Sequence, residues 1–167
     1  YEVDLWGRLR RANEAARANL LAAEAAQQTV RQTLVAQVAS TYLTLLELDY
    51  ELEIARNTYG ARTNSLALTQ ARQKGGIASL QDVYQAQVLV ATAEGAIVES
   101  LRSIEEQENE LSILLGRNPG PIPRTATLAQ QQQPPEIPAG LPSELLRRRP
   151  DVLGSEQLLI AANASIG

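Results

Sequence analysis

The stretch ARQKGGIASLQDV, residues 71–83, decides the fold because it ends one long helix and begins another. Gly75 and Gly76 are a helix-ending signal, since glycine tolerates the positive φ that a helix C-terminal cap usually needs. Arg72 and Lys74 precede them, and cations in a last turn interact favourably with the negative end of the helix dipole. The first helix is therefore predicted to stop at this point.

A second helix is predicted to start a few residues later. Ser79 and Asp82 have the spacing of a capping box, in which the serine side chain accepts from the Asp82 amide and the carboxylate accepts from exposed N-terminal amides. Because so few residues separate the stop from the start, the two helices must lie antiparallel and side by side.

Apolar residues recur at every seventh position on both sides of this turn. On the first arm they are Val38, Leu45, Leu52, Tyr59 and Leu66, and on the second Val83, Val90, Ile97, Ile104 and Leu111, with small Ala86, Ala93 and Ser100 beside them. A sustained heptad repeat favours coiled-coil packing. We therefore predict an all-α fold, a long antiparallel coiled-coil hairpin. A plain helical bundle would bury the same stripe of apolar residues and is the alternative fold.

Composition limits the chemistry. The 167 residues include no Cys and no His, which excludes thiol nucleophiles, imidazole bases and soft-metal sites. The net charge is −4 and Lys74 is the only lysine, so no nucleic-acid-binding stripe is present. There is no glycine-rich phosphate loop and no Ser, His and Asp set. We predict no enzyme activity, no cofactor and no metal.

Other segments give weaker signals. Residues 1–5 alternate apolar and acidic side chains, as in a strand, and residues 8–73 favour one helix of about 66 residues, roughly 100 Å long. The second helix is predicted to end at Leu115. No apolar run has membrane-spanning length and no leader precedes Tyr1, so we expect a soluble chain, unprocessed as written.

The last third of the chain is predicted to be mostly irregular. Residues 118–142 are too rich in Pro and Gln for a helix or a central strand, and residues 143–148 favour a short helix. Pro150 suits the first position of a third helix, expected to reach residue 167. Val152, Leu159 and Ile166 give it a further stripe with steps of seven.

Four glutamates near the end of the second helix form a possible carboxylate cluster. A helix spreads such residues around its surface, so a solvated face is the preferred interpretation. They are Glu105, Glu106, Glu108 and Glu110.

Five segments together resemble a known family. They are YEVDLWGRLRR (1–11), KGGIASLQDV (74–83), LLGRNPGPI (114–122), LPSELLRRRPDV (141–152) and AANASIG (161–167). In this order they resemble the first half of the outer-membrane channel proteins of tripartite efflux pumps, the TolC-like and more closely the OprM-like group (NodT-type outer membrane lipoproteins). The resemblance covers essentially the whole chain.

The resemblance implies a division of the chain. Residues 1–7 would be the end of a membrane barrel strand, and 8–115 the periplasmic α-helical hairpin of an α-barrel, with its tip at 74–82. Residues 116–150 would be an equatorial loop and short helix, a small mixed insert, and 151–167 the start of the helix that returns toward the barrel. No lipid-anchor cysteine, membrane strand pair or second half is present, so we expect an excised periplasmic piece.

The resemblance also implies a function. It indicates a homotrimeric membrane channel of the outer membrane, the passive exit duct of a drug or metal efflux pump, associated with multidrug resistance. Its partners would be a periplasmic adaptor (membrane fusion) protein and an inner-membrane pump of the resistance-nodulation-division type. Nucleic acid is not an expected partner.

The turn is the candidate docking site. By resemblance, the adaptor-docking tip comprises Gly75, Gly76, Ile77, Ala78, Ser79 and Leu80, and Asp82 takes part in the gate. Ile77 and Leu80 are apolar where a mere turn would be polar, and a matching apolar partner would bury them. The alternative is that Ile77 staples the loop and Asp82 only caps the helix. For Asp82 both roles are compatible.

A rival function is a coiled-coil scaffold or an adaptor hairpin without channel activity, and an enzyme is a more distant one. Compact β domains with a lipoyl-like pattern would flank an adaptor hairpin. A second long hairpin with barrel strands in the parent gene would favour the channel.

Overall fold

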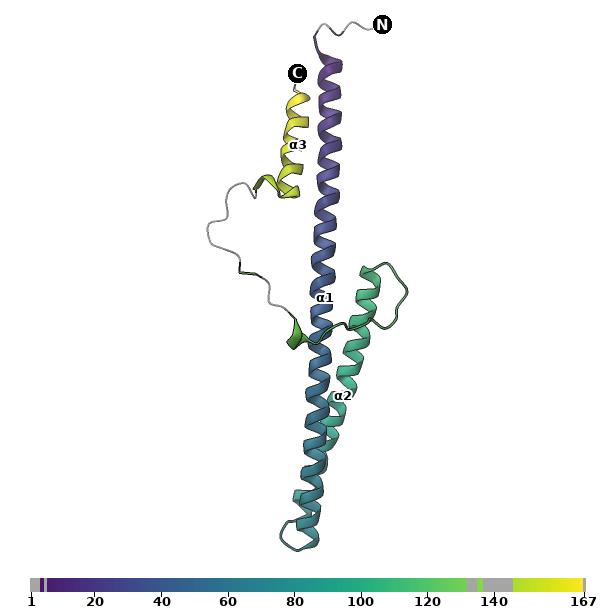
Figure 1. Ribbon diagram of the computed structural model, residues 1–167, viewed down its shortest axis with the longest axis vertical. Helices are drawn as coiled ribbons and strands as arrows, with labels where there is room; N and C mark the ends of the chain where they lie inside the picture. Colours follow the sequence, from purple (N-terminus) through teal and green to yellow (C-terminus); the bar gives the residue numbers. More distant parts are fainter. Residues whose placement is uncertain (1–3, 5, 132–134, 137–145, 167) are drawn as a thin grey trace. The chain divides into compact units, whose positions relative to one another are not determined.

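The computed structural model describes residues 4, 6–131, 135–136 and 146–166. In chain order its elements are α1 (Arg8–Lys74), α2 (Leu80–Leu114), the 3-10 helix η1 (Leu128–Gln130) and α3 (Pro150–Ala164), as Figure 1 shows. No strand occurs within these described ranges. The all-α prediction is confirmed, and the strand expected at residues 1–5 falls almost wholly outside the described residues.

The chain divides into two compact units, and each is described by itself. Unit 1 comprises residues 1–36 and 134–167, and unit 2 comprises residues 37–133. Helix α1 contributes to both, because its 67 residues contain no proline and only one glycine, Gly60, to interrupt them.

Unit 2 contains the turn of the predicted hairpin and the paired parts of its two helices. Its part of α1 lies beside α2, and the chain reverses at the turn between them (Figure 1). The heptad residues Leu45, Leu52, Ile104 and Leu111 are buried in one apolar cluster. Each side chain of this size contributes about 1.5–3 kcal/mol when fully buried. The predicted packing of the two arms is therefore confirmed.

A fifth residue of this cluster comes from the segment after α2. Helix α2 ends in a Schellman motif, in which Gly116 has φ +65° and the Arg117 N–H donates to the Ser112 carbonyl at 3.0 Å. The chain then turns back over the hairpin, and Ile122, with 6% of its surface exposed, joins the cluster. This apolar contact holds the loop against both helices.

Unit 1 packs α3 on the first part of α1 through small residues. Ala18 and Ala22 of α1 are buried, as are Ala161 and Ala164 of α3. Gly154 lets the backbones approach, since a Cβ added there would lie 3.5 Å from the Ala25 Cβ and 3.7 Å from the Ala22 carbonyl oxygen.

The apolar residues that stand seven apart on the third helix do not form its packed face. Val152, Leu159 and Ile166 are all exposed, Leu159 by 70% and Ile166 by 84%. The contact uses alanine and glycine instead, because two backbones that approach closely leave no room for branched side chains.

The end of α3 and the segment after α2 differ from the prediction, and the segment 143–148 is only partly described. Helix α3 ends at Ala164 with Ser165 as its cap instead of reaching residue 167. The 3-10 turn η1 lies inside the segment predicted to be irregular. Of the short helix expected at 143–148, residues 143–145 lie outside the described residues. Among the helices described, none is both long and apolar enough to cross a membrane.

Candidate functional site

The turn between α1 and α2 closes with local hydrogen bonds. The Ile77 N–H donates to the Arg72 carbonyl at 2.9 Å, and the Gly76 N–H donates to the Gln73 carbonyl at 3.0 Å. This is the Schellman pattern, and Gly76 supplies the left-handed residue it needs, with φ +72°. Of the two predicted glycines, Gly76 is therefore the one whose conformation requires glycine.

The start of α2 has the predicted capping box. The Asp82 N–H donates to Ser79 Oγ at 3.1 Å, and the Ser79 N–H and hydroxyl both donate to Asp82 Oδ2 at 2.8 Å. The side-chain hydrogen bond from Ser79, followed by the backbone one, lowers the pKa of Asp82 below its ordinary value. Asp82 is thus held ionised at the positive end of α2.

The remaining tip residues form an apolar end to unit 2. The side chain of Ile77 is 82% exposed and that of Leu80 is 54% exposed, while Ala78 is half-buried. Gly75, Gly76 and Ser79 are exposed as well. The structure therefore brings all six candidate tip residues together in one turn, with Asp82 one helical turn inside it.

A second group of polar side chains, centred on Arg124, was not predicted from the sequence. Its Nε donates to Asp49 Oδ2 at 2.8 Å and its Nη2 to Asp49 Oδ1 at 3.2 Å. Its Nη1 donates to Glu108 Oε1 and to the Ile122 carbonyl. One guanidinium thus links α1, α2 and the loop after α2. The available signal was that Arg124 is the only charged residue between Asn118 and Pro135.

The interpretation of the four glutamates as a solvated face is wrong for Glu108. Its side chain is only 15% exposed, and it accepts from the Ile122 N–H at 3.1 Å as well as from Arg124. Burial raises the pKa of Glu108, but the hydrogen bonds from Arg124 and Ile122 lower the pKa further than burial raises it, aided by the charges of Arg124 and Arg117. Glu106 remains on the surface, paired with Arg102, and Glu105 and Glu110 are exposed.

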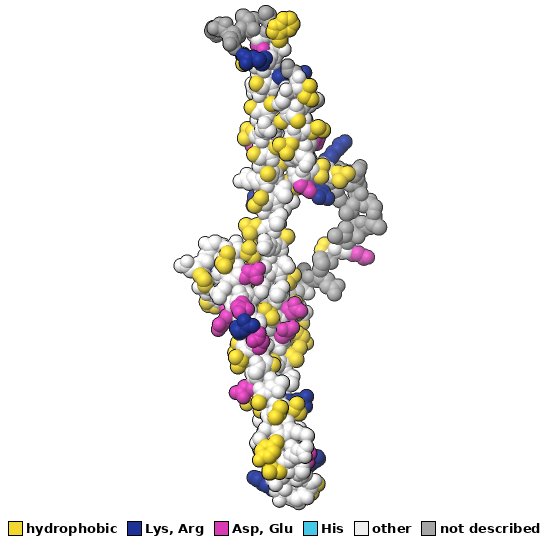
Figure 2. All heavy atoms as spheres, turned by 180° about the vertical axis from the view of Figure 1, so that it is seen from behind, with side chains coloured by type: hydrophobic (Ala, Val, Ile, Leu, Met, Phe, Trp, Pro, Cys, Tyr) yellow, Lys and Arg dark blue, Asp and Glu magenta, His cyan; other side chains and the backbone are white. Residues whose placement is uncertain are grey.

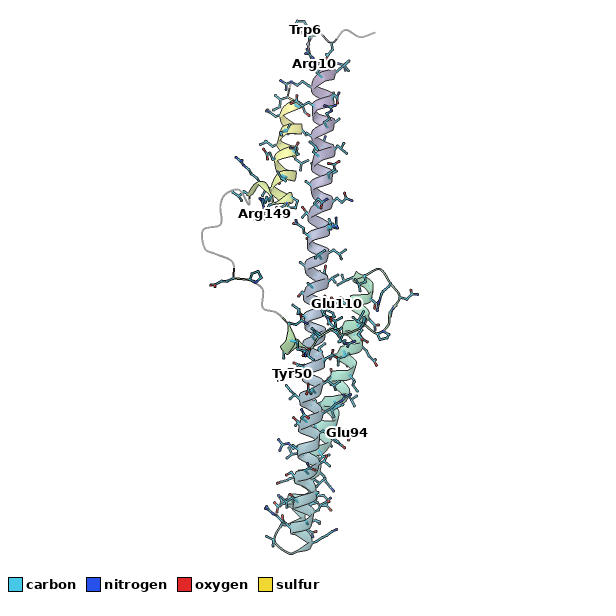
Figure 3. All side chains as sticks on the ribbon, viewed as in Figure 1. Trp6, Arg10, Tyr50, Glu94, Glu110 and Arg149 are labelled. Carbon is cyan, nitrogen blue, oxygen red and sulfur yellow. The ribbon has the colours of Figure 1, made fainter. Side chains whose placement is uncertain are left out.

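Beside Arg124 lies a shallow hollow of about 430 Å³ in unit 2. Its floor comes from α1, including Leu46 and Tyr50, and its rim from the segment Arg124–Gln130. Figure 3 labels Tyr50 near η1. Acidic side chains gather over this hairpin, as Figure 2 shows from behind. In the described part of the chain, no three His, Cys, Asp or Glu side chains group as metal ligands do.

The chain as a whole is similar to known proteins. The family model described as outer membrane efflux protein matches residues 1–117. The toluene efflux pump outer membrane protein TtgF of Pseudomonas putida is 38% identical over the whole chain, and the match covers 35% of the relative. The antibiotic efflux pump outer membrane protein ArpC of Pseudomonas putida is 37% identical, with 34% of its length covered.

Two solved structures have the same fold as this chain over its whole length. The structure of CusC, from work on folding and transmembrane channel formation, superposes on this chain with a TM-score of 0.92 at 33% sequence identity. The superposition covers all of this chain and 39% of CusC. A membrane protein from Pseudomonas aeruginosa superposes with a TM-score of 0.89 at 37% identity, again over the whole chain and 39% of the other. The chain thus spans about a third of the length of the curated relatives it matches.

Proposed function

The chain belongs to the outer membrane efflux protein family, and on that premise we propose that it is the periplasmic part of an outer-membrane efflux channel. The parent channel is a homotrimer and the passive exit duct of a tripartite pump. The observation that carries this proposal is the superposition of the whole chain on CusC at a TM-score of 0.92. No catalytic step is assigned to the chain, since its relatives are named as efflux proteins.

The proposal assigns each segment a place. Residues 1–7 end a membrane barrel strand and residues 8–115 form the periplasmic hairpin. Residues 116–150 form the equatorial segment and residues 151–167 start the helix that returns toward the barrel. The Schellman turn of α1 and the chain reversal that it produces support the position of the tip at 74–82.

The tip docks a periplasmic adaptor protein, which connects the channel to an inner-membrane pump of the resistance-nodulation-division type. Ile77 and Leu80 support this assignment because they are exposed apolar side chains. A partner with an apolar surface would remove both from water, whereas a charge at either position would have to be desolvated on docking.

Asp82 serves as both cap and gate residue in this proposal. Its carboxylate is ionised and exposed, and Oδ2 accepts from both the N–H and the hydroxyl of Ser79, so the carboxylate can accept from a further donor. A donor from a neighbouring helix would hold adjacent tips together in the closed channel.

The test is a double charge substitution at the tip of the parent channel. Ile77→Asp with Leu80→Asp should abolish adaptor docking and drug efflux and leave helicity and membrane assembly unchanged, because both side chains lie at the surface. The matched control, Ile77→Leu with Leu80→Ile, keeps the apolar character and should keep both activities. Normal efflux in a well-folded double aspartate variant would show that the adaptor docks elsewhere.

A further inference from the structure

Each of the two helices of the hairpin contains a single glycine. Gly60 is the only glycine of α1, and Gly95 is the only glycine of α2. Neither has a positive φ, and no atom lies within 4 Å of a Cβ added at either position. Both the backbone and the packing of the chain would therefore admit alanine, which is the better helix former.

The two glycines lie at the same level of the hairpin. Leu52 of α1 and Ile104 of α2 belong to the same buried cluster. Gly60 lies eight residues beyond Leu52 in the direction of the turn, and Gly95 lies nine residues before Ile104. The two distances differ by one residue, about 1.5 Å along a helix. Both helices are thus weakened at one level, since glycine destabilises a helix interior relative to alanine.

The part of the hairpin away from the turn is held firmly. It contains the buried cluster, and the Arg124 ion pairs join both helices to the loop after α2. In Figure 1 this loop crosses the hairpin well away from the turn. Figure 3 labels Glu94, the neighbour of Gly95, on the part of α2 between the loop and the turn.

The part of the hairpin on the turn side is held less firmly. The structure describes residues 53–103 throughout, and within them Val83 and Ala93 are the only buried residues. Over the same residues no hydrogen bond or ion pair joins α1 to α2. Local opening is easiest where few buried apolar contacts and few bonds must be broken. The glycines therefore lie where the hairpin changes from firmly to loosely held.

We propose that Gly60 and Gly95 form a hinge in unit 2. The arm that they bound, residues 61–94, bends at this level relative to the part of the hairpin held by the loop after α2. A hinge needs only a few residues that absorb a change in φ and ψ. Bending there moves the tip while the buried cluster stays packed. The inference concerns unit 2 by itself and does not depend on the proposed function.

Amide hydrogen exchange in the 167-residue chain gives a first test. Peptides that contain Gly60 or Gly95 should be less protected than peptides from residues 45–53 and 104–112, which carry the buried cluster. Gly60→Ala with Gly95→Ala should raise the protection of the first two peptides about fivefold for each glycine replaced. The protection of the other two peptides should not change.

A distance measurement follows the bending itself. The chain contains no cysteine, so single cysteines placed at Ala71 near the end of α1 and at Ala129 in η1 can carry spin labels. Both positions are exposed. The hinge predicts a broad distribution of distances between the two labels in the original chain. It predicts a narrower distribution when both glycines are replaced by alanine.

Two further variants separate a hinge from a general gain in helix stability. Ser40→Ala with Asn109→Ala raises the helix propensity of both helices in the firmly held part and should leave the distance distribution unchanged. Ala61→Gly with Ala96→Gly, added to the double alanine variant, returns one glycine to each helix at the same level. This variant should restore both the broad distribution and the low protection.

An unchanged distance distribution in the double alanine variant would overturn the proposal, as would equal narrowing in the Ser40 and Asn109 control. Failure of the Ala61 and Ala96 variant to restore the breadth would also overturn it, because the glycines would then act through a contact at their own positions. Circular dichroism checks that each variant keeps its helices. The assays contain neither adaptor nor pump, so their outcome is independent of the tip substitutions that test channel function.

Discussion

Replacing Arg124 by methionine should destabilise unit 2 by about 2 kcal/mol. The value lies between the 0–1 kcal/mol typical of exposed ion pairs and the 3–5 kcal/mol typical of a buried charge that loses its partner. An intermediate value fits because the side chains of Arg124, Asp49 and Glu108 are 26%, 34% and 15% exposed. Most of the loss comes from Glu108, whose carboxylate keeps only the Ile122 N–H as a donor.

Urea unfolding followed by circular dichroism measures this loss as a lower midpoint at unchanged slope. The control is Arg102→Met, which also removes a guanidinium bound to two carboxylates, those of Glu99 and Glu106. Those three side chains are exposed, so the control should unfold like the original chain. Equal midpoints for the two variants would refute the argument that burial makes the Arg124 network stabilising.

The same comparison has a predicted pH dependence. The pKa of Glu108 is lowered in the folded state, so its contribution is present above the unfolded pKa of glutamate, about 4.3. It is lost as the pH falls through the lower folded pKa. The stability difference between the original chain and Arg124→Met should therefore shrink in acid, and a difference that grows below that pH would contradict the assignment.

Two further substitutions test the ends and contacts of the helices. Ser79→Ala removes the side chain that caps α2 and should cost about 1 kcal/mol in urea unfolding, whereas Ser65→Ala, inside α1 and away from its ends, should cost little. Gly154→Val should cost about 1–3 kcal/mol in unit 1, because its methyl groups extend past a Cβ already 3.5 Å from Ala25. Gly95→Val is the control, since no atom lies within 4 Å of a Cβ there, and equal costs at the two glycines would show that the close contact is unimportant.

The sequence by itself determined where the helices of the hairpin begin and end. Caps are local chemistry: Gly76 bonds Gln73, Ser79 and Asp82 bond each other, and Pro150 opens α3. Such bonds join residues a few positions apart, so a motif in the sequence predicts them. The heptad spacing likewise predicted the buried face of the hairpin, because period and helix geometry fix which side chains share a face.

Only the tertiary structure decided which residues meet across long distances in the chain. Arg124 finds Asp49 at a separation of 75 residues and Glu108 at a separation of 16, and no local pattern encodes either pairing. The tertiary structure also decided which face of α3 packs against α1. Its apolar stripe includes Val152 and Leu159, which are exposed, whereas Gly154 and Ala161 make the contact because close backbone packing on alanines of α1 admits only small side chains.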